Sequence, residues 1–550
     1  MDVLTLEKTA ESTLAAPDAL DKMPEVLESV ANTAGESEKT LPKKINTSRY
    51  SEVTSAGMRG VCAKRVSVQV HLTSGLPKFH IVGLGDTAVK ESHRRVTAAL
   101  KNSGFSVPDG VITVNLAPAL LHKSGTGFDL PIALGILMAD GALPKDSFDD
   151  CLVIGELGLN GAISNVRGMV GFGMLARKLN KTLICADTSI FEGLLDLSVL
   201  QMQHLDSFTD SSAAQARSLS LEGGRPVPQT VHNCGDYAEV LGQQQAVRAL
   251  TIAAAGQHNI LMVGPPGTGK TMLASRLPTI LPKLTSDELI ETALVNSVAD
   301  VPFDHRRRQR PFRAPHHSST TVGIVGGGNP VRPGEASLAH NGVLFLDEMP
   351  QFSQHCLQSL RQPLEDGTIR IVRASGSLSF PAHIMLVAAA NPCPCGYLGD
   401  QTKNCRCLPA QIEQYQNRIG GPLMDRFQMF VTVSRPDPNR FFERRQSSTD
   451  QPTSQMLAQQ VNVARDFAAA SGHGFSRDLS REELCSPDLI DTQALELLRT
   501  AAQRLELSGR SIVGTLRLAR TIADMGQSAQ VGSAHLSEAL SYRKTWSSDD

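Results

Sequence analysis

A phosphate-binding loop is the residue pattern with the clearest chemistry. Residues 264–271 read Gly-Pro-Pro-Gly-Thr-Gly-Lys-Thr and match G-x-x-x-x-G-K-[ST] at every fixed position. Backbone N–H groups of such a loop wrap a triphosphate, Lys270 can reach the β- and γ-phosphates, and the Thr271 hydroxyl can ligate Mg²⁺. An apolar run before the loop, residues 260–263, predicts a buried strand, and residues 272–277 predict a helix. This context favours a nucleotide site over a glycine-rich turn, with these expected ATP-binding residues: Gly264, Pro265, Pro266, Gly267, Thr268, Gly269, Lys270 and Thr271.

Two neighbouring carboxylates, Asp347 and Glu348, follow a second apolar run, residues 343–346, which predicts a buried strand. Asp347 is expected to hold the Mg²⁺ shell, and Glu348 to act as the general base that polarises the attacking water. The alternative is a strand that ends in solvated acids at a turn. The phosphate loop lies upstream, close enough in sequence to belong to the same domain, and this favours the catalytic interpretation.

Two further residues suit the same site. Asn391 ends a third apolar run, residues 384–390, and can orient the water or sense the γ-phosphate, although Asn-Pro by itself is only a turn signal. Arg426 suits the role of an arginine finger because guanidinium is planar and permanently charged. For Arg426 the residues alone favour a surface salt bridge equally.

Four of the ten cysteines form a C-x-C…C-x-C set with nine residues between the pairs: Cys393, Cys395, Cys405 and Cys407. Four thiolates that close a short loop suit a tetrahedral, structural Zn²⁺ site, since no position stays open for a substrate. Free thiols or a redox pair are the alternatives. A zinc ion here would fix the loop between Asn391 and Arg426.

Composition narrows the class of protein. The 550 residues predict several domains, and 41% apolar residues are enough for ordinary cores. With a net charge of −2 and 4% aromatic residues, neither a global polyanion-binding surface nor a stacked aromatic platform is expected. No secretory signal, disulfide framework or apolar run of membrane-spanning length is recognised. We therefore expect a soluble cytoplasmic protein with no membrane partner.

Changes in composition divide the chain. Residues 66–72 and 111–116 predict strands and residues 87–101 a helix, which indicates an α/β domain. The expected order is a disordered tail (1–48), an α/β domain (49–215), a linker (216–233), a second α/β domain (234–435), a linker (436–455) and a helical domain (456–545).

The motifs together resemble a known family. A phosphate loop followed by Leu-Asp-Glu, Ala-Asn-Pro and Met-Asp-Arg-Phe is similar to an AAA+ ATPase. Four other stretches narrow the resemblance to the Mg-chelatase-like AAA+ ATPases of the ComM/YifB family, over about residues 50–543: 81–84, 310–317, 334–342 and 519–524.

This resemblance implies a Lon-protease-like (ribosomal S5-type) first domain, an AAA+ P-loop α/β core and a C-terminal helical lid. It also implies a homo-hexameric ring with ATP and Mg²⁺ at subunit interfaces. Asn391 would be the first sensor, Arg426 would act in trans, and Arg510 falls where the lid supplies a second sensor arginine. Some members carry a further Arg where this chain has Gly514, so Arg510 as a surface residue stays an alternative.

The Lon-like resemblance does not extend to protease chemistry. In the matching loop, residues 123–129, Gly127 occupies the position of the nucleophile, and Ser124 and Thr126 are out of register. A serine activated by lysine is therefore missing. We expect no proteolysis, and a role in binding or assembly.

Local basic segments suggest a polyanionic partner. Residues 306–310 are a basic run, which in most proteins is simply a solvent-exposed face. Residues 323–328 resemble a mobile hairpin or pore loop. A hairpin expected at residues 367–380 carries Arg370 and Arg373. Such residues near a channel would follow phosphate backbones without reading bases. The His316-His317 pair has no third ligand at an obvious spacing and is interpreted as structural or as loop packing, not as a metal site.

The leading hypothesis is an ATP hydrolase that remodels single-stranded or branched DNA, by resemblance a helicase for branch migration in recombination or natural transformation. One alternative is a Mg-chelatase-type motor that acts on a protein partner, although such subunits lack the Lon-like domain. A scaffold in which ATP only gates assembly is a third, disfavoured by the intact Asp347 and Glu348.

Overall fold

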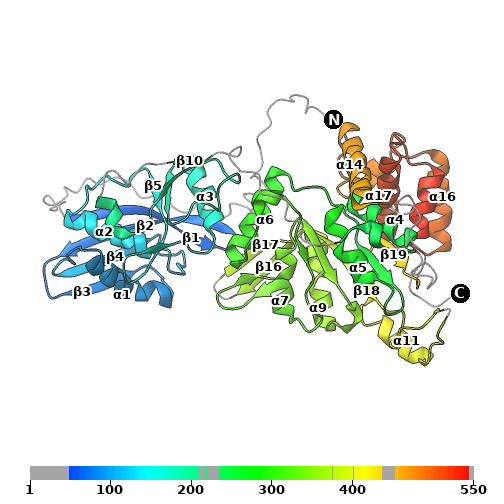
Figure 1. The fold of residues 1–550 in the computed structure, drawn as a ribbon, viewed down its shortest axis with the longest axis horizontal. Helices are drawn as coiled ribbons and strands as arrows, with labels where there is room; N and C mark the ends of the chain where they lie inside the picture. Colours follow the sequence, from blue (N-terminus) through cyan, green and yellow to red (C-terminus); the bar gives the residue numbers. More distant parts are fainter. Residues whose placement is uncertain are drawn as a thin grey trace, which may run out of the picture.

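The structure is a computed structural model that describes residues 49–209, 217–219, 235–373, 376–400, 402–435 and 452–543. The predicted tail and most of both predicted linkers lie outside these residues. The described chain is a mixed α/β protein with two lobes (Figure 1). Among the described residues, no helix combines the length and the apolar character needed to cross a membrane.

The first lobe contains a four-stranded sheet in the order β1-β2-β4-β3. Val66, Val68 and Val70 alternate with polar residues along β2 and are buried on one face, beneath the helices. Helix α1 connects β3 to β4, which is why these two strands pair in parallel. The bounds are β1 Tyr50–Arg59, β2 Cys62–Thr73, β3 Lys78–Val82, α1 Thr87–Asn102, β4 Val111–Ala117 and α2 Asp129–Asp140.

A second sheet of this lobe has the order β10-β9-β8-β5. Its last strand, β10, comes from the start of the predicted linker. The bounds are β5 Cys151–Val153, β6 Glu156–Leu157, β7 Ile163–Ser164, α3 Met169–Lys178, β8 Thr182–Cys185, β9 Leu197–Gln201, η2 Leu205–Thr209 and β10 Arg217–Leu219.

The second lobe is built on a parallel sheet in the order β12-β15-β18-β11-β19. Both faces are buried: Ile260 and Met262 contact one apolar cluster, and Leu261 contacts the other. Burial on both faces explains why these strands are uninterrupted apolar runs. The bounds are β11 Ile260–Val263, β12 Phe312–Arg313, β15 Gly342–Leu346, β18 Ile384–Ala390 and β19 Met429–Thr432.

Short helices and hairpins surround this sheet. They are η3 Tyr237–Glu239, α4 Gln244–Gly256, α5 Lys270–Ser275, η4 Leu277–Thr279, α6 Ser286–Ala299, η5 His305–Arg307, α7 Thr321–Val325, β13 Gly326–Gly327, β14 Arg332–Pro333, α8 Glu335–Leu338, η6 Met349–Gln351, α9 Gln354–Ser359, α10 Arg361–Asp366, β16 Thr368–Arg373, β17 Gly376–Pro381, α11 Pro409–Gln416 and α12 Gly421–Met424.

The C-terminal segment is helical and packs against α4 of the sheet domain. Leu457, Val461 and Ala464 form the buried stripe of its first helix. The bounds are α14 Ser454–Ala470, α15 Arg481–Leu484, α16 Thr492–Arg504, α17 Gly509–Met525 and α18 Ser533–Ser541.

The two lobes touch where the β1–β2 hairpin reaches the β16–β17 hairpin (Figure 1). Gly60, at the tip, has φ +63°, and a Cβ on it would lie 3.3 Å from the Ser379 carbonyl oxygen. Val61 and Phe380 are buried in one apolar cluster that also includes side chains of α3 and α6. The arginine-bearing hairpin is therefore braced by the first lobe.

Candidate nucleotide site and metal centre

The phosphate loop connects β11 to α5. Gly267 and Gly269 have φ of +77° and +89°, in the region that favours glycine. A Cβ on Gly264 would lie 2.1 Å from the Val433 carbonyl oxygen, so the loop can leave the sheet here only without a side chain. The loop geometry thus depends on these glycines.

Lys270 lies at the first turn of α5 with its ammonium directed back into the loop. Its Nζ donates to the carbonyl oxygens of Gly264 (2.7 Å) and Pro265 (2.9 Å), and lies 3.3 Å from Asn391 Oδ1. Burial lowers the pKa of Lys270 to about 8, although Asp347 and Glu348 act in the opposite direction. Its present partners are neutral oxygens, which the negatively charged oxygens of a triphosphate can replace.

The acidic residues lie at the end of β15, beside the loop. Thr271 Oγ1 donates to Asp347 Oδ2 at 2.6 Å, and the Glu348 N–H donates to Asp347 Oδ1 at 2.9 Å. A hydroxyl and a carboxylate in contact form the oxygen donor set that Mg²⁺ prefers, so these residues fit the ion. Glu348 has φ +48°, an uncommon conformation for a residue with a side chain.

A histidine pair lies near the acids. The rings of His316 and His317 are 4.0 Å apart between centroids, and His317 Nδ1 is 3.9 Å from Glu348 Oε2. That distance is too long for a hydrogen bond and is within ion-pair range when the imidazole is protonated. The sequence signalled the pair but not its position beside Glu348.

Arg426 and Arg510 lie together, and the structure shows no bond from either to the described phosphate loop. Both donate through Nη2 to the same carboxylate oxygen, Glu365 Oε1. Arg426 follows α12, Arg510 lies in the first turn of α17, and Glu365 belongs to α10. No sequence motif marks Glu365, so residue patterns alone do not predict its place in this cluster.

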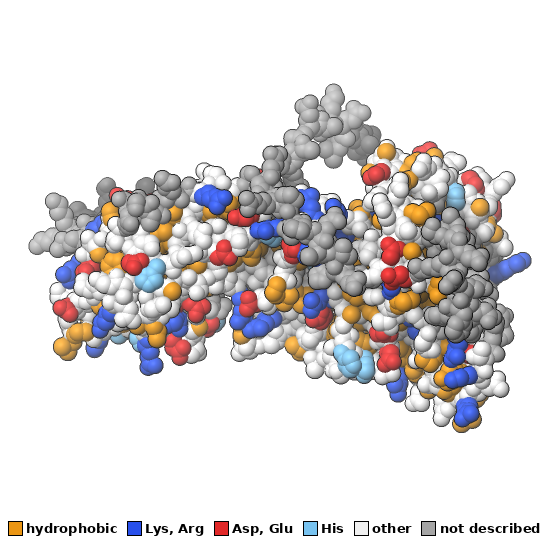
Figure 2. Space-filling model, viewed as in Figure 1, with side chains coloured by type: hydrophobic (Ala, Val, Ile, Leu, Met, Phe, Trp, Pro, Cys, Tyr) orange, Lys and Arg blue, Asp and Glu red, His pale blue; other side chains and the backbone are white. Residues whose placement is uncertain are grey.

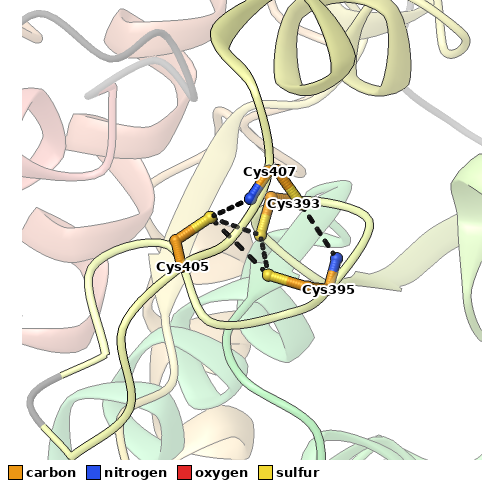
Figure 3. A group of neighbouring side chains, drawn as sticks. All are labelled: Cys393, Cys395, Cys405 and Cys407. Carbon is orange, nitrogen blue, oxygen red and sulfur yellow. Dashed lines mark hydrogen bonds between the residues drawn. The ribbon is translucent and has the colours of Figure 1, made fainter.

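The four cysteines converge in the loop between β18 and α11 (Figure 3). Sulfur–sulfur distances are 3.4 Å for Cys393–Cys395 and 3.6 Å from Cys405 to each of them. All four Sγ atoms lie within 4.8 Å of one another. Thiolates around one Zn²⁺ are about 3.8 Å apart, given Zn–S bonds of about 2.3 Å, whereas a disulfide requires about 2.05 Å. The donor set therefore fits zinc.

Local hydrogen bonds favour the thiolate form at one of the four cysteines, Cys395, whereas the pKa of the Cys393, Cys405 and Cys407 thiols is raised. Burial acts to raise the pKa of the Cys395 thiol, but backbone N–H groups, including that of Arg406, outweigh it and lower that pKa. The same loop packs on the phosphate loop: Gly396 has φ +82°, and a Cβ on it would lie 2.7 Å from Pro266 Cδ. The cysteine loop and the phosphate loop are thus in direct contact.

Three family descriptions match successive parts of the chain. "Magnesium chelatase, subunit ChlI" matches residues 236–441, "Subunit ChlI of Mg-chelatase" matches residues 68–189, and "Magnesium chelatase, subunit ChlI C-terminal" matches residues 451–543. The fold and these matches define a magnesium-chelatase-like protein of the AAA+ class. Membership of this class implies ATP and Mg²⁺.

Two curated relatives extend over almost the whole chain. "Competence protein ComM" of Haemophilus influenzae is 42% identical over 89% of this chain and 97% of its own length. "Uncharacterized protein YifB" of Escherichia coli is 39% identical over 88% and 95%. By contrast, the magnesium-chelatase 38 kDa subunit of Cereibacter sphaeroides is 24% identical over 28% of this chain. The chain belongs to the ComM/YifB family, as its motifs predicted.

Proposed function

We propose that this protein hydrolyses ATP. The observation that supports it best is the convergence of Lys270, Thr271 and Asp347 at the ends of two strands of one parallel sheet. Lys270 and the loop N–H groups bind the phosphates, Glu348 accepts a proton from the attacking water, and Asn391 orients that water. A bound Mg²⁺ would supply charge neutralisation at the β- and γ-phosphates.

We further propose a homo-hexameric ring in which Arg426 and Arg510 act on the nucleotide of a neighbouring copy. The support is that both arginines bond Glu365, while the described partners of the chain's own Lys270 Nζ are Gly264, Pro265 and Asn391. Arg510 lies in the first turn of α17, which the resemblance treats as part of a helical lid. A structural Zn²⁺ at the four cysteines would hold the adjoining loop in shape.

DNA is the proposed substrate, with branch migration in recombination or natural transformation as the process. The relative named "Competence protein ComM" supports this. Acidic and basic side chains intermingle on the face in Figure 2, so a local contact by Arg370 and Arg373 is favoured over a broad basic surface. The magnesium-chelatase matches support the alternative, a motor that acts on a protein partner. We place the protein in the cytoplasm, where ATP is available.

The first lobe is proposed to have a Lon-like fold and to be inactive as a protease. Lys123 is fully buried, and its Nζ donates to the Pro118 carbonyl oxygen rather than to a hydroxyl. Burial lowers the pKa of Lys123. A Cβ on Gly127 would lie 3.3 Å from Val166 Cγ2, which leaves little room for a nucleophile.

One experiment separates these functions. ATP turnover is measured with and without single-stranded and branched DNA, in the natural protein and in Glu348→Gln. Stimulation by DNA that Glu348→Gln abolishes supports the DNA motor, and turnover that requires an added protein supports the chelatase-type motor. Turnover unaffected by Glu348→Gln contradicts the assigned base.

A further inference from the structure

The arginines proposed to act between subunits share a cluster with one carboxylate. Arg426 and Arg510 reach Glu365 from segments far apart in sequence, and all three side chains meet at Glu365 Oε1. Glu365 also lines a cavity of about 460 Å³, together with Arg361, Arg370 and Asp366. Arg361 lies one helical turn before Glu365 on α10.

The positive charge of this cluster is incompletely compensated. Arg426 is only 5% exposed, and in the described part of the chain its Nε has no hydrogen-bond partner. A buried N–H without an acceptor is costly, so an additional acceptor beside Arg426 Nε would be favourable. Burial lowers the pKa of Arg426; Glu365 opposes this, while Arg510 and Arg361 add to it. One carboxylate oxygen thus serves two guanidinium groups, and an anion with more oxygens would fit better.

We propose that Glu365 is a placeholder for phosphate. In the separate chain it holds Arg426 and Arg510 side by side by relieving their mutual repulsion. The terminal phosphate of ATP bound to a second copy then displaces it, because phosphate offers more acceptor oxygens to the same planar donors. Glu365 moves to Arg361, four residues earlier on the helix surface, where side chains at this spacing are neighbours.

This inference rests on the proposed hydrolysis of ATP between subunits and adds a residue that competes with the substrate. Removal of the competing charge should make the arginines easier for phosphate to reach. Glu365→Gln keeps the size of the side chain and its hydrogen-bonding oxygen. The ATP concentration for half-maximal turnover should fall about two- to fivefold, the range expected for a partly exposed ion pair. The kcat should not decrease.

The matched control is Glu496→Gln, which removes the carboxylate of an exposed ion pair with Arg499 on α16. It should leave both kinetic values unchanged. A second measurement follows assembly by analytical ultracentrifugation as a non-hydrolysable ATP analogue is added. Glu365→Gln should assemble at a lower analogue concentration than the natural protein, and Glu496→Gln should not.

Different failures lead to different conclusions. An unchanged half-saturating concentration in Glu365→Gln, or a lower kcat without that change, shows that Glu365 only supports the structure and overturns the inference. If the natural protein assembles with the analogue but hydrolyses no ATP, the proposed hydrolysis is wrong. The analogue concentration at which Glu365→Gln assembles then still tests the role of Glu365. A natural protein that neither assembles nor hydrolyses ATP overturns both.

Discussion

Lys270 Nζ lies 3.3 Å from Asn391 Oδ1, although the two residues are 121 positions apart in sequence. They meet because β11 and β18 pair in parallel, with Val263 opposite Ala390, so that the residues beyond both ends emerge at one edge of the sheet. A cation that binds phosphate and an amide that can orient water are thereby placed at the same point. This register therefore positions the phosphate-binding residue Lys270 beside Asn391, the residue proposed to orient the attacking water.

The unusual pKa of Lys270 predicts a pH-dependent affinity for ATP. Burial lowers this pKa to about 8, so the ammonium is charged below pH 8 and loses its proton above it. Phosphate binding needs the charged form, and affinity for a fluorescent ATP analogue should fall about tenfold between pH 8 and pH 9.5. Lys270→Arg, whose guanidinium stays charged, is the control and should bind with little change over this range. Parallel profiles for the two proteins would contradict the assignment.

Glu348→Gln should separate binding from hydrolysis. The amide keeps the size of the side chain but cannot accept a proton, so turnover should fall about 10²- to 10⁴-fold. Affinity for the nucleotide should stay within about twofold, because Lys270 and Thr271 are intact. Equilibrium binding and phosphate release are measured on the same preparation. Asp347→Asn is the comparison. It should also raise the Mg²⁺ concentration needed for half-maximal turnover, since Asp347 bonds Thr271 in the proposed Mg²⁺ site. Loss of binding in Glu348→Gln would contradict the role of base.

The sequence predicted the sheet well because its strands are buried on both faces. The predicted runs at residues 260–263, 343–346 and 384–390 match β11, β15 and β18 within one residue. A phosphate loop places Lys270 and Thr271 by local geometry alone, so their neighbourhood needs little tertiary information. The AAA+ resemblance could be recognised for a related reason, because the phosphate loop, Leu-Asp-Glu and Ala-Asn-Pro lie at the ends of these strands.

Other parts of the site could not be predicted from the sequence. Glu365 lies on a short helix with no motif that marks it, and its importance comes from arginines 61 and 145 positions away. His317 was interpreted as loop packing, and only the fold brings it near Glu348. The contact of Gly396 with Pro266 likewise depends on how two loops cross. Such contacts follow from tertiary packing, for which residue spacing carries no signal.

The β16–β17 hairpin predicts a measurable contribution to DNA binding. Arg370 and Arg373 are exposed. Phe380 of the same hairpin is buried in one apolar cluster with Val61 of the first lobe, which holds the hairpin in place. Each phosphate contact that is lost should reduce the slope of log affinity against log salt by about 0.7 for single-stranded DNA. The slope is negative, and the double variant Arg370→Ala/Arg373→Ala should therefore reduce its magnitude by about 1.4. The same variant should weaken the stimulation of ATP turnover by DNA.

Arg499→Ala/Arg504→Ala is the control for that measurement, because it removes the same charge from α16, outside the hairpin. Its salt slope should equal that of the natural protein. ATP turnover without DNA should be the same in the natural protein and in this control. If both double variants reduce the slope equally, the effect reflects net charge, and the hairpin is not the contact.

The four-cysteine loop predicts that metal and nucleotide binding are coupled. Cys405 lies 3.6 Å from both Cys393 and Cys395, so Cys405→Ser should lower the zinc content measured by mass spectrometry from about one ion per chain to near zero. Because Gly396 of the same loop rests on Pro266, affinity for an ATP analogue should fall several-fold, and the thermal midpoint should decrease. Cys485→Ser, a partly buried cysteine outside the cluster, should keep both zinc and affinity. Purified natural protein without zinc would contradict the metal site, while zinc loss with unchanged nucleotide affinity would show that the two loops touch without being coupled.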